Sequence, residues 1–362
     1  MTDLFSPLEM KRGPDWKNRF MLAPLTNQQS YPDGILSDDE FNWLTKRAEG
    51  DFGLTMTCAA AIRARGVGFP GQLGVYDDKH LAGLTRLASA INEHGSHSVV
   101  QLHHAGMRTP HDLIEGPPEC PSDNEEWGAK ALSLEQVENL KEDFIAGAKR
   151  AQAAGFHGVE LHGAHGYILG QFLSAEVNQR DDKYGGSLEN RSRILFDLIA
   201  AIREQCGENF SLGVRLSPER FGMQIGEIID LAGQLLVDDR IDYLDMSLWD
   251  VFKPAGEDPY KDKSLLSLFT DLPRSHVKLG AAGKIMTASD ARRAMDAGLD
   301  FVVIGRGAIL HHNFPGLVQH NADFEPATLP VSAAHLKQEG LSDTFVKYMR
   351  NWKGFVADDA VS

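Results

Sequence analysis

The chain has 362 residues, and its 36 basic and 51 acidic side chains give a formal net charge of −15. Apolar residues make up 42% and charged residues 24%, which is typical of a globular protein and argues against a disordered chain. The acidic balance disfavours nucleic acid and anionic membranes as partners, and there is no run of 18 apolar residues to cross a bilayer. We therefore expect a cytoplasmic protein that acts on small molecules.

The three cysteines, Cys58, Cys120 and Cys206, are far apart in the sequence. This spacing fits neither a zinc ribbon nor a disulfide framework, so we expect free thiols. No low-complexity segment or Ser/Gly linker divides the chain, and we expect a single domain over residues 1–362.

Short apolar runs recur along the chain, each followed by a polar turn and an amphipathic helix. Runs of four or five apolar residues are typical of buried parallel strands. The expected strands are Phe20–Ala23, Leu54–Thr57, Ser98–Leu102, Gly158–Leu161, Leu212–Leu216, Tyr243–Ser247, His276–Leu279 and Phe301–Ile304.

Helix starts fall between these strands. Ser37 and Ser133 each begin a capping box, and further helices are expected after Ser187 and Thr287. Alternating strands and helices of this number predict an α/β protein with eight parallel strands, a (β/α)8 TIM barrel; a doubly wound sheet is the alternative. Extended loops, residues 105–132 and 249–272, follow the third and sixth strands, as lids over an active site or as surface insertions.

A glycine-rich motif at residues 66–71 satisfies the dinucleotide pattern G-x-G-x-x-G. That motif binds a pyrophosphate only when a strand precedes it directly and a helix begins at its end. Here Pro70 lies inside the motif and no helix start follows, so we interpret the segment as an ordinary loop.

The segment most suggestive of chemistry follows the fourth expected strand and contains His162, His165 and Tyr167. Two histidines three residues apart occur as zinc ligands, but a catalytic zinc needs a third protein ligand, and no completing motif is present. The histidines could instead be structural. A third interpretation is that they donate hydrogen bonds to a substrate oxygen while Tyr167 donates a proton.

The sequence around these residues favours the third interpretation. The pattern H-x-x-H-G-Y at residues 162–167 is followed by R-x-D-x-Y-G-G-S-x-x-N-R at residues 180–191. This combination resembles the Old Yellow Enzyme family of flavin-dependent ene reductases, and the resemblance extends from Asn18 to about Gly307. It implies a barrel with non-covalent FMN that uses NAD(P)H to reduce the C=C bond of activated alkenes such as α,β-unsaturated aldehydes, ketones and nitroalkenes.

The resemblance also assigns a flavin site to residues at the ends of the expected strands. Thr26 would hydrogen-bond the flavin, Gln101 would hold its pyrimidine ring, and Arg215 would place a cation beside its N1–C2=O edge. Backbone amides at glycines, together with an arginine, would bind the phosphate. The flavin-binding residues implied are Ala23, Pro24, Leu25, Thr26, Ala59, Gln101, Arg215, Gly283, Gly305 and Arg306.

For catalysis, the resemblance implies that His162 and His165 bind the carbonyl or nitro oxygen of the alkene. It also implies that Tyr167 protonates the α carbon of the alkene. Where one bacterial branch of the family has a substrate-contacting tyrosine, this chain has Asn27-Gln28-Gln29, and Gln28 is our candidate to replace it. A zinc-dependent hydrolase on the same barrel and a non-catalytic flavin-binding protein are the rival functions.

The C-terminal segment, residues 330–362, contains aromatic and basic residues at 348–352. Some relatives insert such a tail into the active site of a neighbouring subunit. The resemblance thus predicts a homo-oligomer with the tail at a subunit interface, and ordinary helix packing within one chain is the alternative.

Overall fold

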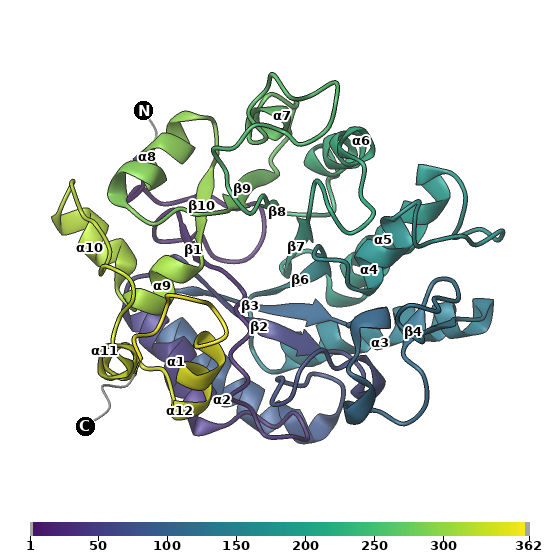
Figure 1. Ribbon diagram of the computed structural model, residues 1–362, viewed down its shortest axis with the longest axis horizontal. Coiled ribbons are helices and arrows are strands. Elements are labelled where there is room, and N and C mark those ends of the chain that lie inside the picture. The colour runs from purple at the N-terminus through teal and green to yellow at the C-terminus, as the bar shows by residue number, and fades with distance from the viewer. Residues whose placement is uncertain (1–2, 359–362) are drawn as a thin grey trace.

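The computed structural model describes residues 3–358, and eight parallel strands close a barrel at its centre (Figure 1). Around the barrel the strands follow the order β1-β10-β9-β8-β7-β6-β3-β2, and every neighbouring pair is parallel. This topology confirms the predicted TIM barrel. The barrel strands are β1 (Phe20–Leu22), β2 (Leu54–Ala61), β3 (His97–His103), β6 (Gly158–Gly163), β7 (Ser211–Leu216), β8 (Tyr243–Ser247), β9 (Lys278–Ala282) and β10 (Phe301–Ile304).

The seventh barrel strand, β9, begins later than the predicted range His276–Leu279. His276 lies before β9, where its ring Nε2 contacts the carbonyl of Ile241 at 3.0 Å. The strand then continues through Gly280, Ala281 and Ala282, whose small side chains do not form an obvious apolar run. Gly280 is required there, because a Cβ would lie 2.0 Å from the ring of Phe301 in the next strand.

Longer helices surround the barrel between its strands: α1 (Asp38–Glu49), α2 (Leu81–Glu93), α3 (Leu134–Ala153), α5 (Leu188–Cys206), α6 (Ile225–Leu236) and α8 (Ala288–Asp296). The hydroxyls of Ser133 and Thr287 accept the N3 amide in complete capping boxes. At α1 only half of the predicted box forms. Ser37 accepts the Glu40 amide, but the buried Glu40 carboxylate binds Ser30 and Asn27 instead of the cap.

Aromatic side chains fill the N-terminal end of the barrel. Leu8 and Trp16, from the segment before β1, pair in an antiparallel bridge. The Trp16 ring packs edge-on against Phe301 at 4.8 Å and against Tyr243 at 5.7 Å between ring centres. Because this end is filled, an open site is left to the opposite end, where the strands terminate.

The two expected long loops carry short elements. The first includes the 3-10 turns η3 (Gly106–Arg108) and η4 (His111–Leu113) and a parallel pair formed by β4 (Glu119–Cys120) and β5 (Lys130–Ala131). The second includes α7 (Ser267–Thr270), and the short α4 (Ile168–Leu173) follows β6. None of the helices that the structure describes has the length and apolarity needed to cross a membrane.

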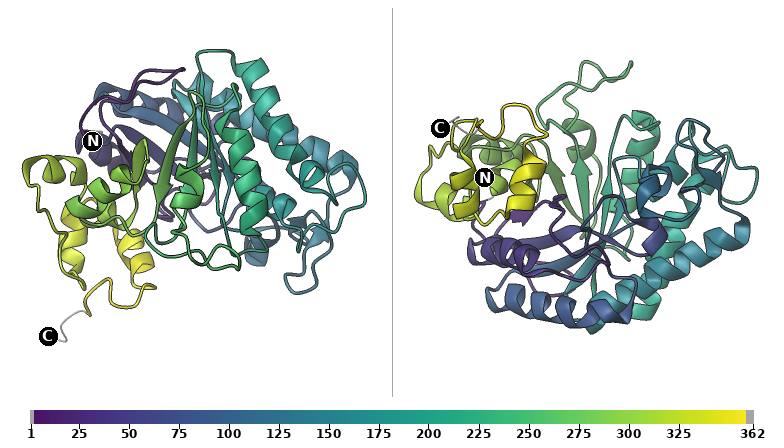
Figure 2. Two further views of the ribbon diagram at one scale, coloured as in Figure 1. Left: turned by 90° about the horizontal axis from the view of Figure 1, so that it is seen from above. Right: turned by 60° about the horizontal axis from the view of Figure 1, so that its bottom comes forward.

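After β10 the chain forms four short helices: α9 (Arg306–Leu310), α10 (Phe314–His320), α11 (Ala333–Gln338) and α12 (Asp343–Met349). Figure 2 shows α11 and α12, in yellow, lying against the purple N-terminal part of the barrel. Phe345 of α12 packs edge-on against Trp43 of α1 at 4.8 Å between ring centres. The amide of Ser342 donates to the Gln29 side chain at 3.1 Å. The tail therefore folds onto its own barrel, next to the loop that follows β1.

Candidate active site

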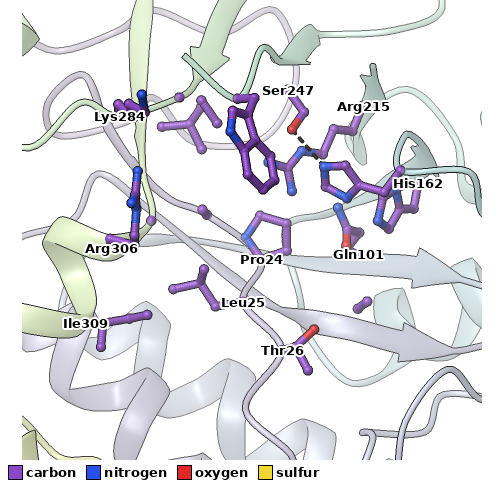
Figure 3. A pocket seen from close by; sticks show the side chains of 18 of the residues that line it. Pro24, Leu25, Thr26, Gln101, His162, Arg215, Ser247, Lys284, Arg306 and Ile309 are labelled. Carbon is purple, nitrogen blue, oxygen red and sulfur yellow. Dashed lines mark hydrogen bonds between the residues drawn. The ribbon is translucent and has the colours of Figure 1, made fainter. Parts of the chain in front are cut away.

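A cavity of about 330 Å³ opens at the C-terminal ends of the barrel strands. Figure 3 shows Gln101, His162 and Arg215 on one side of it, and Lys284 and Arg306 on the other. Pro24 and Leu25 lie between the two sides. We call this space the inner cavity.

The predicted site residues converge on the inner cavity, with one exception. The predicted residues that line it are Ala23, Pro24, Leu25, Thr26, Ala59, Gln101, His162, His165, Tyr167, Arg215, Gly283, Gly305 and Arg306. Gln28, the predicted substrate contact, is not among the lining residues. Its backbone has a φ of 58°, and its carbonyl lies against Gly71 in the glycine-rich loop. The chain turns at Gln28, which lies outside the lining of the inner cavity, and its contact with substrate stays a prediction.

One buried ion pair and one buried hydrogen bond form the floor beneath one side of the cavity. The Gln101 amide donates to Glu160 at 2.7 Å, and Arg215 Nε lies 2.8 Å from the Asp245 carboxylate. Burial raises the pKa of Glu160 to about 8, and the neighbouring Asp245 adds to this shift. These partners fix the orientation of Gln101 and Arg215. Among the described residues, none pairs with the terminal nitrogens of Arg215, which are left to face the cavity.

The two histidines and the tyrosine form one cluster. The rings of His162 and His165 lie 5.1 Å apart between centres, and His162 lies 5.1 Å from Tyr167. His103, at the end of β3, packs edge-on against Tyr167 at 4.3 Å. His165 has a left-handed backbone (φ 60°), and its Nε2 hydrogen-bonds the Ser247 hydroxyl at 2.7 Å. A strained, non-glycine residue of this kind is typical of a functional site.

Both histidines are neutral at physiological pH. Burial lowers the pKa of His162 and of His165 well below the usual value, and nearby positive groups lower them further. His162 Nδ1 accepts the Ala164 amide at 3.3 Å, so the proton of the neutral ring lies on Nε2. His162 is thus a hydrogen-bond donor without a charge.

Tyr167 retains its proton. Burial raises the pKa of its hydroxyl, and the nearby Arg108 offsets only part of that shift. No side chain or carbonyl in residues 3–358 hydrogen-bonds this hydroxyl. A protonated, unpartnered hydroxyl beside two neutral imidazoles can donate a proton to a bound molecule.

The opposite side of the cavity has the properties of an anion site. Gly283 has a φ of 155°, and a Cβ there would lie 2.8 Å from the Asp250 amide, so only glycine fits. At Gly305 an added Cβ would meet Leu25 at 3.7 Å, an ordinary van der Waals contact, so the site does not exclude a side chain there. Within the described chain, Arg306 has no hydrogen-bond or ion-pair partner, whereas Lys284 pairs with Asp250 at 2.9 Å.

Comparisons with known proteins agree with this geometry. Residues 3–325 match the NADH:flavin oxidoreductase / NADH oxidase family. The chain belongs to this family. It is 35% identical over 340 residues to a probable NADH-dependent flavin oxidoreductase, YqiG, of Bacillus subtilis, covering 90% of each chain. It is 32% identical over 309 residues to an NADPH dehydrogenase of Bacillus licheniformis, covering 84% of this chain and 90% of that one.

Solved structures of Old Yellow Enzyme relatives share the fold. The Old Yellow Enzyme homologue from Zymomonas mobilis superposes with a TM-score of 0.80 at 26% identity, covering 95% of this chain and 99% of that one. Morphinone reductase in complex with tetrahydroNAD gives a TM-score of 0.80 at 25% identity, covering 100% and 99%. The protein is therefore an NAD(P)H-dependent flavin oxidoreductase of the Old Yellow Enzyme family.

Several lining residues of this oxidoreductase were missed in the sequence. Ser247 ends an expected strand, so its position gave a usable signal, and Phe69 lies in the glycine-rich loop. Tyr348, Met349 and Trp352 were not missed: the resemblance placed this tail at the active site of a neighbouring subunit, and here the three residues line the cavity of their own chain. Burial raises the pKa of Tyr348, and the neighbouring Thr26 hydroxyl lowers it in part.

The rival zinc site can be compared with the clusters that the fold assembles. Over residues 3–358, the one group of three potential ligands is His311, His335 and Glu339, with ligand atoms within 4.8 Å of one another. It lies outside the inner cavity. His311 Nε2 accepts a hydrogen bond from the Ala327 amide, so the neutral ring carries its proton on Nδ1. A protonated Nδ1 is a poor metal ligand. His162 and His165 are not part of such a group.

Proposed function

We propose that this flavin oxidoreductase is an ene reductase, which uses FMN and NAD(P)H to reduce the C=C bond of activated alkenes. The observation that carries the proposal is the cluster of two neutral imidazoles and one protonated, unpartnered phenol at the inner cavity. A protein that only stored flavin would need no buried proton donor beside it.

The residues present fit FMN. Arg306, which has no partner among residues 3–358, and the two glycines Gly283 and Gly305 lie at one side of the cavity, where they suit a single terminal phosphate. A fixed cation and a fixed amide, Arg215 and Gln101, lie at the other side, where they suit the polar edge of a flavin ring. Pro24 and Leu25 give an apolar surface between them (Figure 3). FMN, when bound, supplies the acceptor and donor of hydride.

The side chains of this chain perform the remaining tasks. His162 donates a hydrogen bond from Nε2 to the carbonyl or nitro oxygen of the alkene. His165 lies beside His162. Negative charge develops on that oxygen as hydride reaches the β carbon, and neutral donors in a buried site stabilise it. Tyr167 then gives its proton to the α carbon, so one hydride and one proton are added across the double bond.

The substitution Tyr167→Phe tests this proposal, because it removes the hydroxyl and keeps the ring packed against His103. Proton donation is needed only when the alkene is reduced. Rapid-mixing absorbance should therefore show NAD(P)H-driven flavin bleaching within a fewfold of wild type, and enone reduction slowed by about 10²–10⁴-fold. Nitroalkenes should be affected less, because their reduced anion can leave without a proton.

The matched controls are His162→Ala and His165→Ala, which remove polarisation of the substrate and leave Tyr167 in place. We expect both to weaken binding of the alkene and to slow its reduction. Equal slowing of both half-reactions in Tyr167→Phe, or no slowing at all, would refute the assignment of the proton donor. Stoichiometric zinc and hydrolytic activity in the purified protein would favour the rival hydrolase.

A further inference from the structure

A second cavity of about 260 Å³ adjoins the inner cavity, and we call it the outer cavity. The inner and outer cavities share five lining residues, so a ligand bound in the inner cavity can extend directly into the outer cavity. The shared residues are His165, Tyr167, Ser247, Trp249 and Trp352. The outer cavity therefore begins at the groups proposed to hold the alkene.

Two arginines line the outer cavity. The guanidinium carbon of Arg108 lies 5.1 Å from the Tyr167 ring centre and 5.6 Å from that of Phe221. The guanidinium carbon of Arg220 lies 5.6 Å from the same Phe221 ring and 5.1 Å from Trp249. Aromatic faces thus hold both cations toward one space.

The charge of these arginines is not neutralised by the protein. Arg108 donates to the His165 carbonyl at 2.5 Å, and among the described residues neither arginine pairs with a carboxylate. The nearest acid in the cavity, Glu219, already forms an ion pair with Lys253 and accepts the Gly256 amide. Two uncompensated cations remain, in a chain whose net charge is −15.

The backbone that presents Arg220 is strained. Arg220 and Phe221 have φ values of 67° and 55°, and Gly222 follows at 75°. Consecutive non-glycine residues in the left-handed region cost free energy, and such conformations concentrate at ligand sites. A surface arginine with no partner would not require this turn.

We propose that the outer cavity is an anion subsite, which binds a carboxylate carried by the alkene at the end remote from its activating oxygen. The proposal rests on the proposed function and names its substrate class: electron-poor alkenes that also bear an anionic group. A carboxylate would accept hydrogen bonds from the two guanidinium groups while the reactive end lies at His162, His165 and Tyr167. The diphosphate of the nicotinamide cosubstrate has the same anionic chemistry, but a ribose separates it from the reacting ring, whereas the outer cavity directly adjoins His165 and Tyr167.

The test compares two substrates that differ at one end, where one carries a carboxylate and the other a neutral methyl ester. 4-Carboxycinnamaldehyde and its methyl ester have the same enal and a similar shape. In wild type we expect kcat/KM to be about tenfold higher for the acid at low ionic strength, the effect of one charge-assisted hydrogen bond. Added salt should reduce this preference, because screening weakens the exposed charge pair.

Arg220→Gln is the main variant, since Gln keeps hydrogen-bonding groups and removes the charge. It should lower kcat/KM for the acid about tenfold and leave the ester within twofold, and Arg220→Lys should restore part of the loss. Arg108→Gln is a second variant, in which only the ratio of acid to ester is compared: Arg108 also holds the His165 carbonyl, so both substrates should slow, the acid about tenfold more than the ester. Arg292→Gln, whose arginine bonds the Ala322 carbonyl outside both cavities, is the matched control and should change neither substrate.

Two further arms separate the outcomes. Rapid-mixing reduction of the flavin by NADH and NADPH tests whether the subsite binds the diphosphate of the cosubstrate. If Arg220→Gln weakens binding of the nicotinamide cosubstrate but not of the acid, the substrate assignment is wrong. Calorimetry with the saturated analogue 3-(4-carboxyphenyl)propanal and its methyl ester measures binding without turnover. If no alkene is reduced but the acid binds more tightly through Arg220, the proposed reaction fails and the subsite stands. Equal binding of acid and ester to wild type, or an equal loss of both in Arg220→Gln, would overturn the subsite.

Discussion

The floor and the rim of the candidate site are built in opposite ways. The floor consists of four side chains from barrel strands, Gln101, Glu160, Arg215 and Asp245. Each is buried and held by a neighbour in the adjacent strand. The rim consists of loop and tail residues such as Trp249 and Trp352, with exposed fractions of 59% and 46%. A rigid floor suits a cofactor whose electronics must stay constant, and an exposed rim can adapt to substrates.

The largest expected effect lies in the floor. Arg215→Met removes the cation from the cavity and leaves the Asp245 carboxylate buried without a partner. Loss of one member of a buried pair costs about 3–5 kcal/mol of folding free energy. Separately, loss of the charge-assisted hydrogen bond to the flavin edge should lower FMN affinity about 100-fold and make the flavin reduction potential more negative. Fluorescence titration of FMN and spectroelectrochemistry measure the two quantities.

The double variant Arg215→Met, Asp245→Asn is the control for this prediction. It removes the uncompensated carboxylate and should recover stability against urea without recovering FMN affinity. If the single variant still binds flavin with an unchanged potential, Arg215 does not contact the flavin ring.

Glu160 offers a pH test of the same floor. The pKa of this carboxyl is about 8 in the folded protein, against 4.5 for an ordinary glutamate. A raised pKa stabilises the fold below pH 4.5, and this contribution is lost as the pH rises toward 8, because ionisation then charges a buried group. Wild type should therefore lose on the order of a few kcal/mol of unfolding free energy between pH 5 and pH 8 relative to Glu160→Gln.

Urea titrations of both proteins, at several pH values and one FMN concentration, measure this difference. Glutamine keeps an acceptor for the Gln101 amide, so the floor geometry is retained in the variant. If the unfolding free energies of the two proteins change with pH in parallel, the pKa of Glu160 is that of an ordinary glutamate.

The sequence predicted the floor better than the rim for a physical reason. Apolar runs mark the strands, whose ends meet at one edge of a parallel barrel, and the family resemblance singled out Gln101 and Arg215 there. Their buried partners Glu160 and Asp245 were missed, because a carboxylate inside a strand gives no signal of what it pairs with. The rim depends on how loops fold back. The left-handed turn at Gln28 and the return of Trp352 to its own cavity leave no periodic signal. His103 was missed because the expected strand stopped one residue short of it.

Deletion of the residues from 346 onward should have an effect on activity between those of the floor and rim substitutions. It removes Tyr348, Met349 and Trp352 from the inner cavity while Phe345 still packs on Trp43. KM for the alkene should rise about tenfold, since several apolar contacts with the substrate are lost. Sedimentation of both proteins tests the predicted homo-oligomer: a wild type that is monomeric at micromolar concentration would reject a tail shared between subunits.

The smallest expected effect lies at the rim, in Trp352→Ala. This side chain lines both cavities and is 46% exposed, so a bound alkene would cover only part of its remaining apolar surface. Burial of such an area contributes about 1 kcal/mol, and KM for the alkene should rise roughly fivefold. FMN affinity should stay unchanged, in contrast to Arg215→Met, because Trp352 belongs to the exposed rim and not to the floor. Trp352→Phe is the matched control and should keep most of the affinity for the alkene. If Trp352→Ala instead releases FMN, the rim also holds the cofactor, and the division of the site into a cofactor floor and a substrate rim is wrong.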